Sequence, residues 1–239
     1  MNIVIPMAGK GTRFSTKGYS FPKPLIEIQN KPMIQIVIEN LNIDGNYFFL
    51  VQKEHYKSYS LKYLLPLITR PNNCKIIQLD GENEGAACTV LESENDINND
   101  DELIIANADQ WVDWSSSHFI DFLHRKEMDG SILIFNSLHP KHSFANVNEN
   151  GLIDRVEEKK PISHHATVGI YYFRRGSEFV NGAKQMMKKN IRTNNEFYIC
   201  PVYNELIDQG SIIYPYPVAE MLGLGTPEEL ERFLEKINN

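Results

Sequence analysis

The sequence predicts an α/β protein in which helices flank a mixed, mainly parallel sheet, with a small second β region. Over the first 130 residues, short runs rich in β-branched and aromatic residues alternate with stretches of helical periodicity. After residue 130 the pattern changes to shorter, strand-like pieces. A chain of 239 residues is long enough to bury such a sheet between two helical layers.

In the first half, strands are expected at 3–7, 47–51, 75–79 and 103–106, and helices near 33–41, 56–67, 86–92 and 119–126. The run 103–106 is continuously apolar, which is typical of a central parallel strand covered on both faces. Asn107 and Asp109 follow it directly. Because open α/β sheets bind ligands at the carboxyl ends of their strands, these two side chains are candidates for a binding site.

In the second half, strands are expected at 131–135, 144–147, 153–156 and 166–173, with a hairpin turn at 148–151. The last helix begins with Thr226 as N-cap, Pro227 in its first position and Glu229 completing a capping box. The sequence contains no recognisable linker or repeat. We therefore expect a single domain over 1–239, with halves 1–130 and 131–239.

Composition excludes several classes of partner. The net charge of −7 gives no general attraction to nucleic acid or to an anionic membrane. No apolar run approaches the roughly 20 residues of a membrane span, and no secretion signal is visible. The three cysteines are far apart without a CxxC spacing, which disfavours structural zinc and favours a reducing compartment. We expect a cytoplasmic protein without nucleic-acid or membrane partners.

A glycine-rich basic loop follows the first expected strand. Its residues are Gly9, Lys10, Gly11, Thr12 and Arg13. Glycines let the backbone approach an anion closely, and successive N–H groups and cations neutralise it, so the loop favours phosphate binding. The spacing matches neither a Walker A loop nor a dinucleotide fingerprint. The alternative is a glycine-rich turn with incidental charge.

Lys23 stands between two prolines about ten residues later. The prolines stiffen the backbone and reduce the entropy lost when this lysine is held against a phosphate, although a Pro-Lys-Pro alone is more often a surface turn. With the preceding loop it resembles the signature of the sugar-phosphate nucleotidyltransferases. Further segments resemble that family in the same order: Gly85-Ala86-Ala87, Asn107-Ala108-Asp109, Glu158-Lys159, Ala166-Thr167-Val168-Gly169-Ile170-Tyr171 and Gly225-Thr226-Pro227-Glu228.

The resemblance implies a Rossmann-like fold of GT-A type and transfer of a nucleoside monophosphate from a triphosphate, with pyrophosphate as product. Arg13 would hold the leaving phosphates, Lys23 the α-phosphate and Asp109 a Mg²⁺ ion. The implied nucleotide contacts are Ala8, Gly9, Gly11, Thr12, Gly85 and Ala86. The implied contacts to the phosphorylated acceptor are Glu158, Lys159 and Gly169, and Glu196 is a candidate there, although the segment 195–198 fits an ordinary loop anchor equally well.

Two positions depart from the family pattern. The family's second metal-binding aspartate is replaced by Gly223, and we hypothesise that Glu220 reaches in instead. Asp80 stands where members using uridine or thymidine nucleotides place a glutamine. Because a carboxylate only accepts hydrogen bonds, Asp80 would favour the exocyclic amine of cytosine, and this predicts CTP as donor.

The segments 107–110, 195–198 and 221–227 resemble a bacterial branch associated with capsular polysaccharide synthesis, in which one activity is cytidylylation of phosphoglutamine. The acceptor is left open between phosphoglutamine and a sugar 1-phosphate.

Two other functions remain open. A GT-A type glycosyltransferase is disfavoured because Asn107 takes the first position of the expected D-x-D motif. A nucleotide-sensing relative without activity would be consistent with Gly223.

Overall fold

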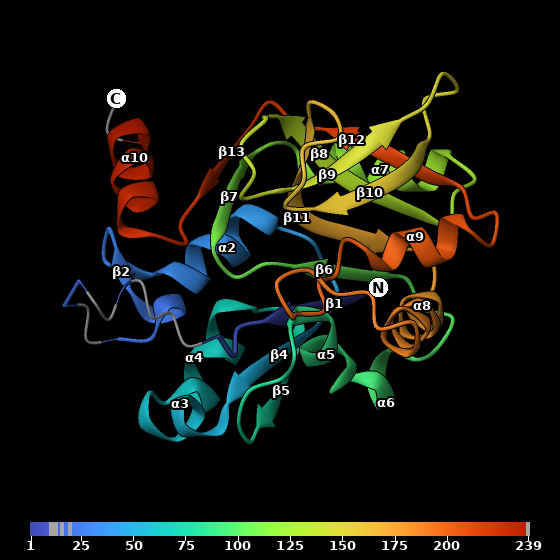
Figure 1. The fold of residues 1–239 in the computed structure, drawn as a ribbon. Helices are drawn as coiled ribbons and strands as arrows, with labels where there is room; N and C mark the ends of the chain where they lie inside the picture. Colours follow the sequence, from blue (N-terminus) through green and yellow to red (C-terminus); the bar gives the residue numbers. More distant parts are fainter. Residues whose placement is uncertain (10–13, 15–16, 19–20, 238–239) are drawn as a thin grey trace.

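The computed structural model describes residues 1–9, 14, 17–18 and 21–237. Within them, nine strands form one mixed sheet through the centre of the molecule (Figure 1). The parallel part has the order β6-β1-β4-β5. Its strands are β1 (Asn2–Pro6), β4 (Asn46–Gln52), β5 (Asn73–Leu79) and β6 (Leu103–Ala106). They confirm the strands expected in the first half.

The second part of the sheet is mostly antiparallel and joins the first along β11, which pairs with β6. Its strands are β8 (Gly130–Asn136), β9 (Ser143–Val147), β10 (Ile153–Glu158), β11 (His165–Phe173) and β12 (Ile213–Pro217). The hairpin between β9 and β10 turns at Gly151, whose φ of 75° lies in the left-handed region. The expected fold class, an α/β sheet with an added β region, is confirmed.

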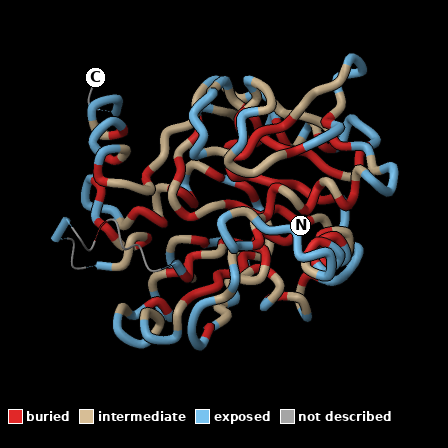
Figure 2. The backbone as a smooth tube through the Cα atoms, viewed as in Figure 1, coloured by how far each residue is buried: buried red, intermediate tan, exposed pale blue. Residues whose placement is uncertain are grey.

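Helices cover both faces of the sheet. One buried cluster includes residues of α2 (Met33–Leu41), α4 (Leu61–Ile68), α7 (Ser116–Arg125) and α10 (Pro227–Ile237). The other includes residues of α5 (Ala86–Leu91), α6 (Glu94–Ile97), α8 (Gly176–Lys188) and α9 (Val202–Ile207). The buried strands therefore lie between two helical layers, and the exposed backbone lies at the periphery (Figure 2).

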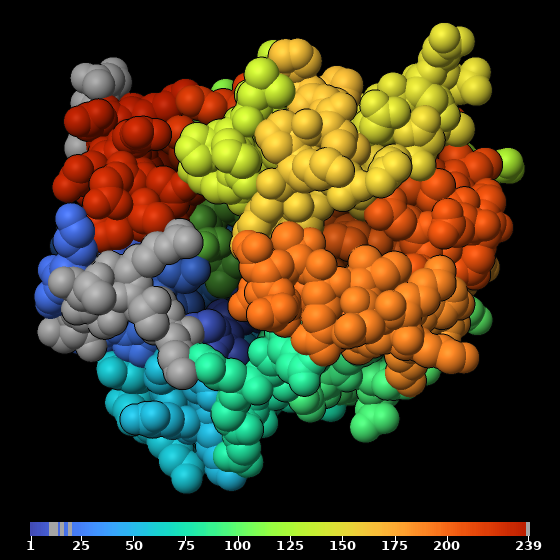
Figure 3. All heavy atoms as spheres, in the orientation of Figure 1, coloured from blue at the N-terminus to red at the C-terminus, as the bar shows by residue number. Residues whose placement is uncertain are grey.

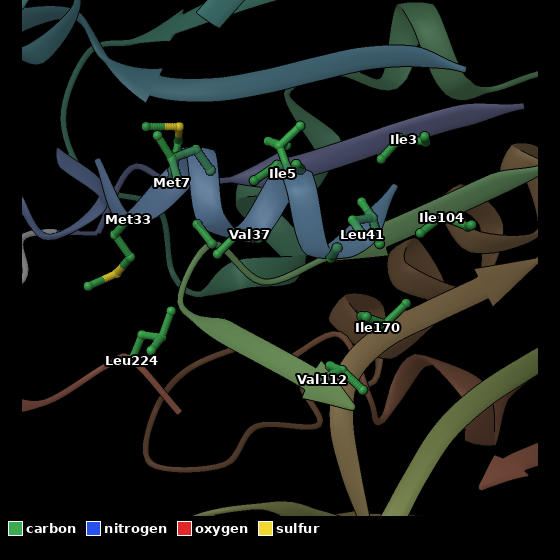
Figure 4. Packing of buried hydrophobic residues seen from close by; sticks show 14 of the residues in the cluster. Ile3, Ile5, Met7, Met33, Val37, Leu41, Ile104, Val112, Ile170 and Leu224 are labelled. Carbon is green, nitrogen blue, oxygen red and sulfur yellow. The ribbon is translucent and has the colours of Figure 1, made fainter. Parts of the chain in front are cut away.

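Alternation along β1 explains how one strand serves both layers. Ile3 and Ile5 belong to the first cluster and face α2, with Ile5 nearer Val37 and Ile3 nearer Leu41 (Figure 4), whereas Val4 belongs to the second cluster. All four residues of β6 are buried on both faces, as the continuous apolar run predicts. The polar residues that end this strand are thereby fixed by a rigid core.

Some elements differ from expectation. The helix expected over 56–67 is two helices, α3 (Lys53–Ser58) and α4, because Ser60 adopts a left-handed φ of 53° between them. A ribbon of β7 (Gln110–Asp113) and β13 (Glu220–Gly223) was not expected, and neither were α8 and α9. The ribbon matters for the site because it brings residues 220–223 beside the segment that follows β6.

At the start of α10, one of the two hydrogen bonds of the predicted capping box is present. The backbone N–H of Glu229 donates to Thr226 Oγ1 at 3.2 Å. The Glu229 carboxylate, however, accepts from Lys141 Nζ and does not turn back to the cap. None of the described helices has the length and apolar character needed to cross a bilayer.

Candidate active site

Two adjoining compartments lie along the carboxyl edge of the parallel strands. The first, of about 470 Å³, borders the ends of β1 and β5, and the second, of about 480 Å³, borders β10 and β11. In Figure 3 the surface is hollowed where blue N-terminal residues and the orange segment near residue 190 face each other. Both compartments share five described residues: Lys23, Ala86, Asn107, Asp109 and Tyr198. We call these shared residues the junction.

The first compartment is built from loops that follow parallel strands. Ala8 and Gly9 follow β1, and Gly85 and Ala86 lie at the start of α5. The Gln52 side chain ties these loops together, because its Nε2 donates to the carbonyls of Ala8 and Gly81, each at 2.9 Å. Backbone groups therefore form much of this wall. The predicted residues Gly11, Thr12 and Arg13 lie outside the described part of the chain.

At the junction Lys23 and Asp109 form an ion pair, with Lys23 Nζ 2.7 Å from Asp109 Oδ2. Lys23 begins a short 3-10 helix after Pro22, and Asp109 follows β6. Their side chains are about one quarter exposed, at 24% and 27%. The structure thus brings together two groups that are 86 positions apart in the sequence and that the sequence singled out separately.

The chain over 192–198 lies against Gly85 and carries Tyr198 to the junction. Phe197 N donates to Glu84 O at 2.8 Å, and Ala87 N donates to Phe197 O at 3.0 Å. A Cβ at Gly85, whose φ is 123°, would lie 2.4 Å from Phe197 O. Glycine is therefore required here by the backbone packing.

Arg192 also fixes the segment 192–198 in place. Its guanidinium lies 3.9 Å from the centre of the Phe197 ring and forms an ion pair with Glu84. The segment that carries Tyr198 is therefore fixed to the turn that precedes α5.

Glu158 lies at the end of β10 and lines the second compartment. Ser143 Oγ donates to its carboxylate. Burial raises the pKa of Glu158, while the hydrogen bond from Ser143 and the charge of Lys159 act in the opposite direction. Thr167 and Tyr171 of β11 add hydroxyl groups to the same wall. This compartment offers hydrogen-bond acceptors and donors for a polar ligand.

Lys159 reaches the junction indirectly. Its Nζ lies 4.5 Å from the centre of the Tyr198 ring and donates to the Tyr198 hydroxyl. That hydroxyl also donates to Glu196. Lys159 is not among the described residues that line either compartment. Glu196 lines the first compartment, which corrects its expected place beside the acceptor, because the backbone pairing of 197 with 84 draws this segment toward α5.

Gly169 has a φ of 94°, and a Cβ there would lie 2.2 Å from Asn107 Nδ2 and 2.6 Å from Gln110 Oε1. Its carbonyl accepts from Asn107 N at 3.0 Å and from Gln110 Nε2 at 3.2 Å. Gly169 lines the second compartment and also lets β11 lie close against the segment that carries Asp109.

Two predicted site residues lie elsewhere. Asp80 is not among the described residues that line the compartments; its carboxylate is 77% exposed and lies 3.0 Å from Lys53 Nζ. Glu220 pairs with Lys236. Because side chains alternate along β13, Met221 and Gly223 face the second compartment and Glu220 does not. The hypothesis that Glu220 replaces the missing aspartate is therefore corrected.

The residues that line the second compartment and that sequence reasoning missed include Lys141, His142 and Glu229. Burial, together with the charge of Lys141, lowers the pKa of His142 to about 4, so this imidazole is neutral near pH 7. Lys141 and Glu229 are 88 positions apart, and no local pattern in the sequence connects them.

The model of the family described as "Nucleotidyl transferase" matches residues 3–215. The chain belongs to this family. It is 25% identical over 176 residues to the bifunctional protein GlmU of Methanocaldococcus jannaschii, covering 72% of this chain and 40% of that protein. It is 26% identical over 179 residues to a mannose-1-phosphate guanyltransferase of Aspergillus oryzae, covering 72% and 49%. The chain thus matches less than half the length of these relatives.

Solved structures match over nearly the whole chain. A nucleoside-diphosphate-sugar pyrophosphorylase from Vibrio cholerae has a TM-score of 0.83 at 25% identity, covering 98% of this chain and 99% of that one. The inositol-1-phosphate CTP transferase from T. maritima has a TM-score of 0.74 at 13% identity, covering 99% and 94%, and shows similarity of fold alone. These matches confirm the nucleotidyltransferase fold.

Proposed function

We propose that this chain transfers a nucleoside monophosphate from a nucleoside triphosphate to a small phosphorylated acceptor and releases pyrophosphate. The observation that carries this proposal is the pair of adjoining compartments that share Lys23 and Asp109. The triphosphate would occupy the first compartment and the acceptor the second. We also propose that residues 1–130 chiefly bind the nucleotide and residues 131–239 the acceptor, although Tyr198 borders both compartments.

In this reaction an oxygen of the acceptor phosphate attacks the α-phosphorus in line. The bond from the α-phosphorus to the bridging oxygen breaks, and its electron pair leaves with pyrophosphate. No protein nucleophile is required, so catalysis depends on positioning and on neutralisation of charge. Lys23 would stabilise the charge on the α-phosphate, and Arg13 would hold the leaving phosphates. Lys159 would contribute its charge indirectly, because its ammonium group donates to the Tyr198 hydroxyl.

Mg²⁺ is the cofactor that we propose, and Asp109 would hold it. Bound Mg²⁺ would neutralise triphosphate charge. Among the described residues no group of three or more histidine, cysteine and acidic side chains gathers as a metal site. This is compatible with Mg²⁺, which is commonly held by one or two carboxylates together with substrate phosphates and water.

We propose CTP as the donor. Glu82, which lies two positions after Asp80 and lines the first compartment, would contact the base in place of Asp80. A carboxylate accepts hydrogen bonds only, and it therefore suits the exocyclic amine of cytosine better than the carbonyl of uracil.

Replacing Glu82 by glutamine is expected to lower the preference for CTP over UTP about tenfold, because an amide both donates and accepts. The measurement is kcat/KM for each triphosphate with one acceptor. The matched variant D80N should keep the wild-type preference, since Asp80 pairs with Lys53 away from the compartment. A preference that changes in D80N and not in E82Q would restore the original assignment of Asp80.

The acceptor is proposed to be phosphoglutamine or a sugar 1-phosphate, within synthesis of capsular or other surface polysaccharide precursors. The sequence resemblance to the capsule branch supports this role. The polar wall of the second compartment, with Glu158, Thr167 and Tyr171, suits either acceptor.

The acceptor KM is expected to rise as pH falls through the raised pKa of Glu158. Burial raises the pKa of Glu158 above its ordinary 4.5, so this side chain loses its charge at a higher pH than an exposed glutamate would. Only the ionised form accepts hydrogen bonds with both oxygens. Below the raised pKa, KM should increase up to about tenfold per pH unit. In E158Q the acceptor KM should be high and should depend on pH less steeply than in wild type, since only the titration of the acceptor phosphate itself remains; a parallel slope in wild type and variant would contradict this assignment.

The proposal is tested by a screen for pyrophosphate release. CTP, UTP, dTTP, ATP and GTP are each paired with phosphoglutamine and a panel of sugar phosphates. Release that requires both substrates is the expected result, highest with CTP. A glycosyltransferase would consume a nucleotide sugar and release no pyrophosphate. A nucleotide-sensing relative would bind the triphosphate without turnover, and either finding would overturn the proposal.

A further inference from the structure

Glu229 occupies a space that two glycines leave open beside Asp109. A Cβ at Gly223 would lie 2.7 Å from Glu229 Cδ and within 2.9 Å of both its oxygens. A Cβ at Gly225 would lie 2.7 Å from Asp109 Oδ2 and 3.4 Å from Glu229 Oε2. The two carboxylates therefore converge on one point, and they do so because neither glycine carries a side chain.

The backbone fixes this convergence. Leu224 N donates to Asp109 O at 2.7 Å, which holds the segment between the two glycines against the end of β6. Gly223 pairs with Gln110 in the β7 and β13 ribbon. The N-terminal hydrogen bond to Thr226 places Glu229 in the first turn of α10. The Glu229 side chain is only 17% exposed.

Each carboxylate is paired with a different lysine. Lys23 donates to Asp109, and Lys141 donates to Glu229. These four side chains line the second compartment, and Lys23 and Asp109 also line the first. Two carboxylates facing each other would repel, and the lysines remove that repulsion while no other cation is present. When a substrate enters, a lysine can also exchange its carboxylate partner for a phosphate oxygen.

We propose that Glu229 is the second protein carboxylate of the divalent-cation site of Asp109, with Lys23 and Lys141 neutralising the pair until metal and triphosphate bind. The physiological ligand of this site, a metal ion bound together with a triphosphate, rests on the proposed function. The donor set suits Mg²⁺, which accepts one or two carboxylates and completes its shell with phosphate and water oxygens. Lys141, released from Glu229, remains in the second compartment as a cation for the acceptor phosphate.

Binding of Mn²⁺ to the full chain tests the proposal without turnover. Free Mn²⁺ is measured by electron paramagnetic resonance, with and without a non-hydrolysable CTP analogue. The variant E229Q is expected to bind Mn²⁺ at least tenfold more weakly than wild type. E231Q is the matched control, because Glu231 lies two positions later on the same helix and is exposed. E220Q should also bind as wild type does. Equal affinity in E229Q and E231Q would overturn the proposal.

Two further variants strengthen the test. K141M should bind Mn²⁺ more tightly than wild type in the absence of nucleotide, since the competing cation is removed. Unchanged or weaker binding would contradict the role of Lys141. In G223D/E229A the new carboxylate takes the space that Glu229 vacates, and Mn²⁺ affinity should recover relative to E229A.

The outcomes also separate this inference from the proposed function. Pyrophosphate release by wild type, together with unaltered Mn²⁺ binding in E229Q, refutes the role of Glu229 alone. Weakened Mn²⁺ binding in E229Q, together with no release from any substrate pair, refutes the proposed reaction and leaves the cation site standing.

Discussion

Replacing Lys23 by methionine should lower kcat/KM for pyrophosphate release by about 100- to 1,000-fold, the range found when one group that stabilises transition-state charge is removed. Methionine keeps much of the apolar stem and loses the ammonium group. The loss should fall mainly on kcat, because the negative charge on the transferred phosphate increases in the transition state. Initial rates at saturating and limiting triphosphate separate kcat from KM.

Lys31 provides the matched control for this variant. It also follows the N-terminal loop, but it pairs with Glu39 at 2.7 Å and is not among the described residues that line the compartments. K31M should therefore retain wild-type turnover. If K23M loses only triphosphate affinity at unchanged kcat, Lys23 binds the substrate without stabilising the transition state, and its proposed role is wrong.

Replacing Gly85 by alanine should destabilise the protein by about 2–4 kcal/mol and raise the KM for the triphosphate. The new Cβ would lie 2.4 Å from Phe197 O and 2.6 Å from Phe197 N at a φ of 123°, so strain of about 1–3 kcal/mol adds to a forced shift of the backbone. That shift would displace both Ala86 and Tyr198 at the junction. Denaturant unfolding and steady-state kinetics give the two effects.

A variant at Gly151 is the control that distinguishes the effect of steric contact from the effect of backbone conformation. Its φ of 75° also lies in the left-handed region, but a Cβ there would meet no atom within 4 Å. G151A should therefore cost only the conformational strain, about 1–2 kcal/mol, and leave the KM unchanged. Equal destabilisation in G85A and G151A would show that the contact with Phe197 contributes nothing.

The strands of the first half were predictable because burial on two faces leaves a strong signal in the sequence. β6 is a continuous apolar run, and its bounds agree with the prediction. The ribbon of β7 and β13 was not predicted. Its strands are only four residues long and lie more than 100 positions apart, so their pairing depends on contacts that no local periodicity records.

The candidate site also contains residues that the sequence predicted, while other predicted residues lie outside it. Lys23, Gly85, Asp109 and Glu158 stand in motifs that resemble the family, and the structure places each at the compartments. Asp80 and Glu220 were chosen by their distance along the chain from a motif. Such a distance does not determine the direction of a side chain, and a shift of one residue in a strand reverses its face. Glu220 and Gly223 illustrate this on β13.

By itself, the sequence determined the fold class and the motifs that carry Lys23 and Asp109; phosphate binding by the N-terminal loop, most of which lies outside the described residues, stays a prediction. These properties depend on local periodicity and on residues close together in the chain. Only the tertiary structure decided which carboxylate stands beside Asp109. Glu229 reaches that place because Gly223 and Gly225 leave space for it and Lys141 neutralises it, and these residues meet only when β13 and α10 pack against the end of β6.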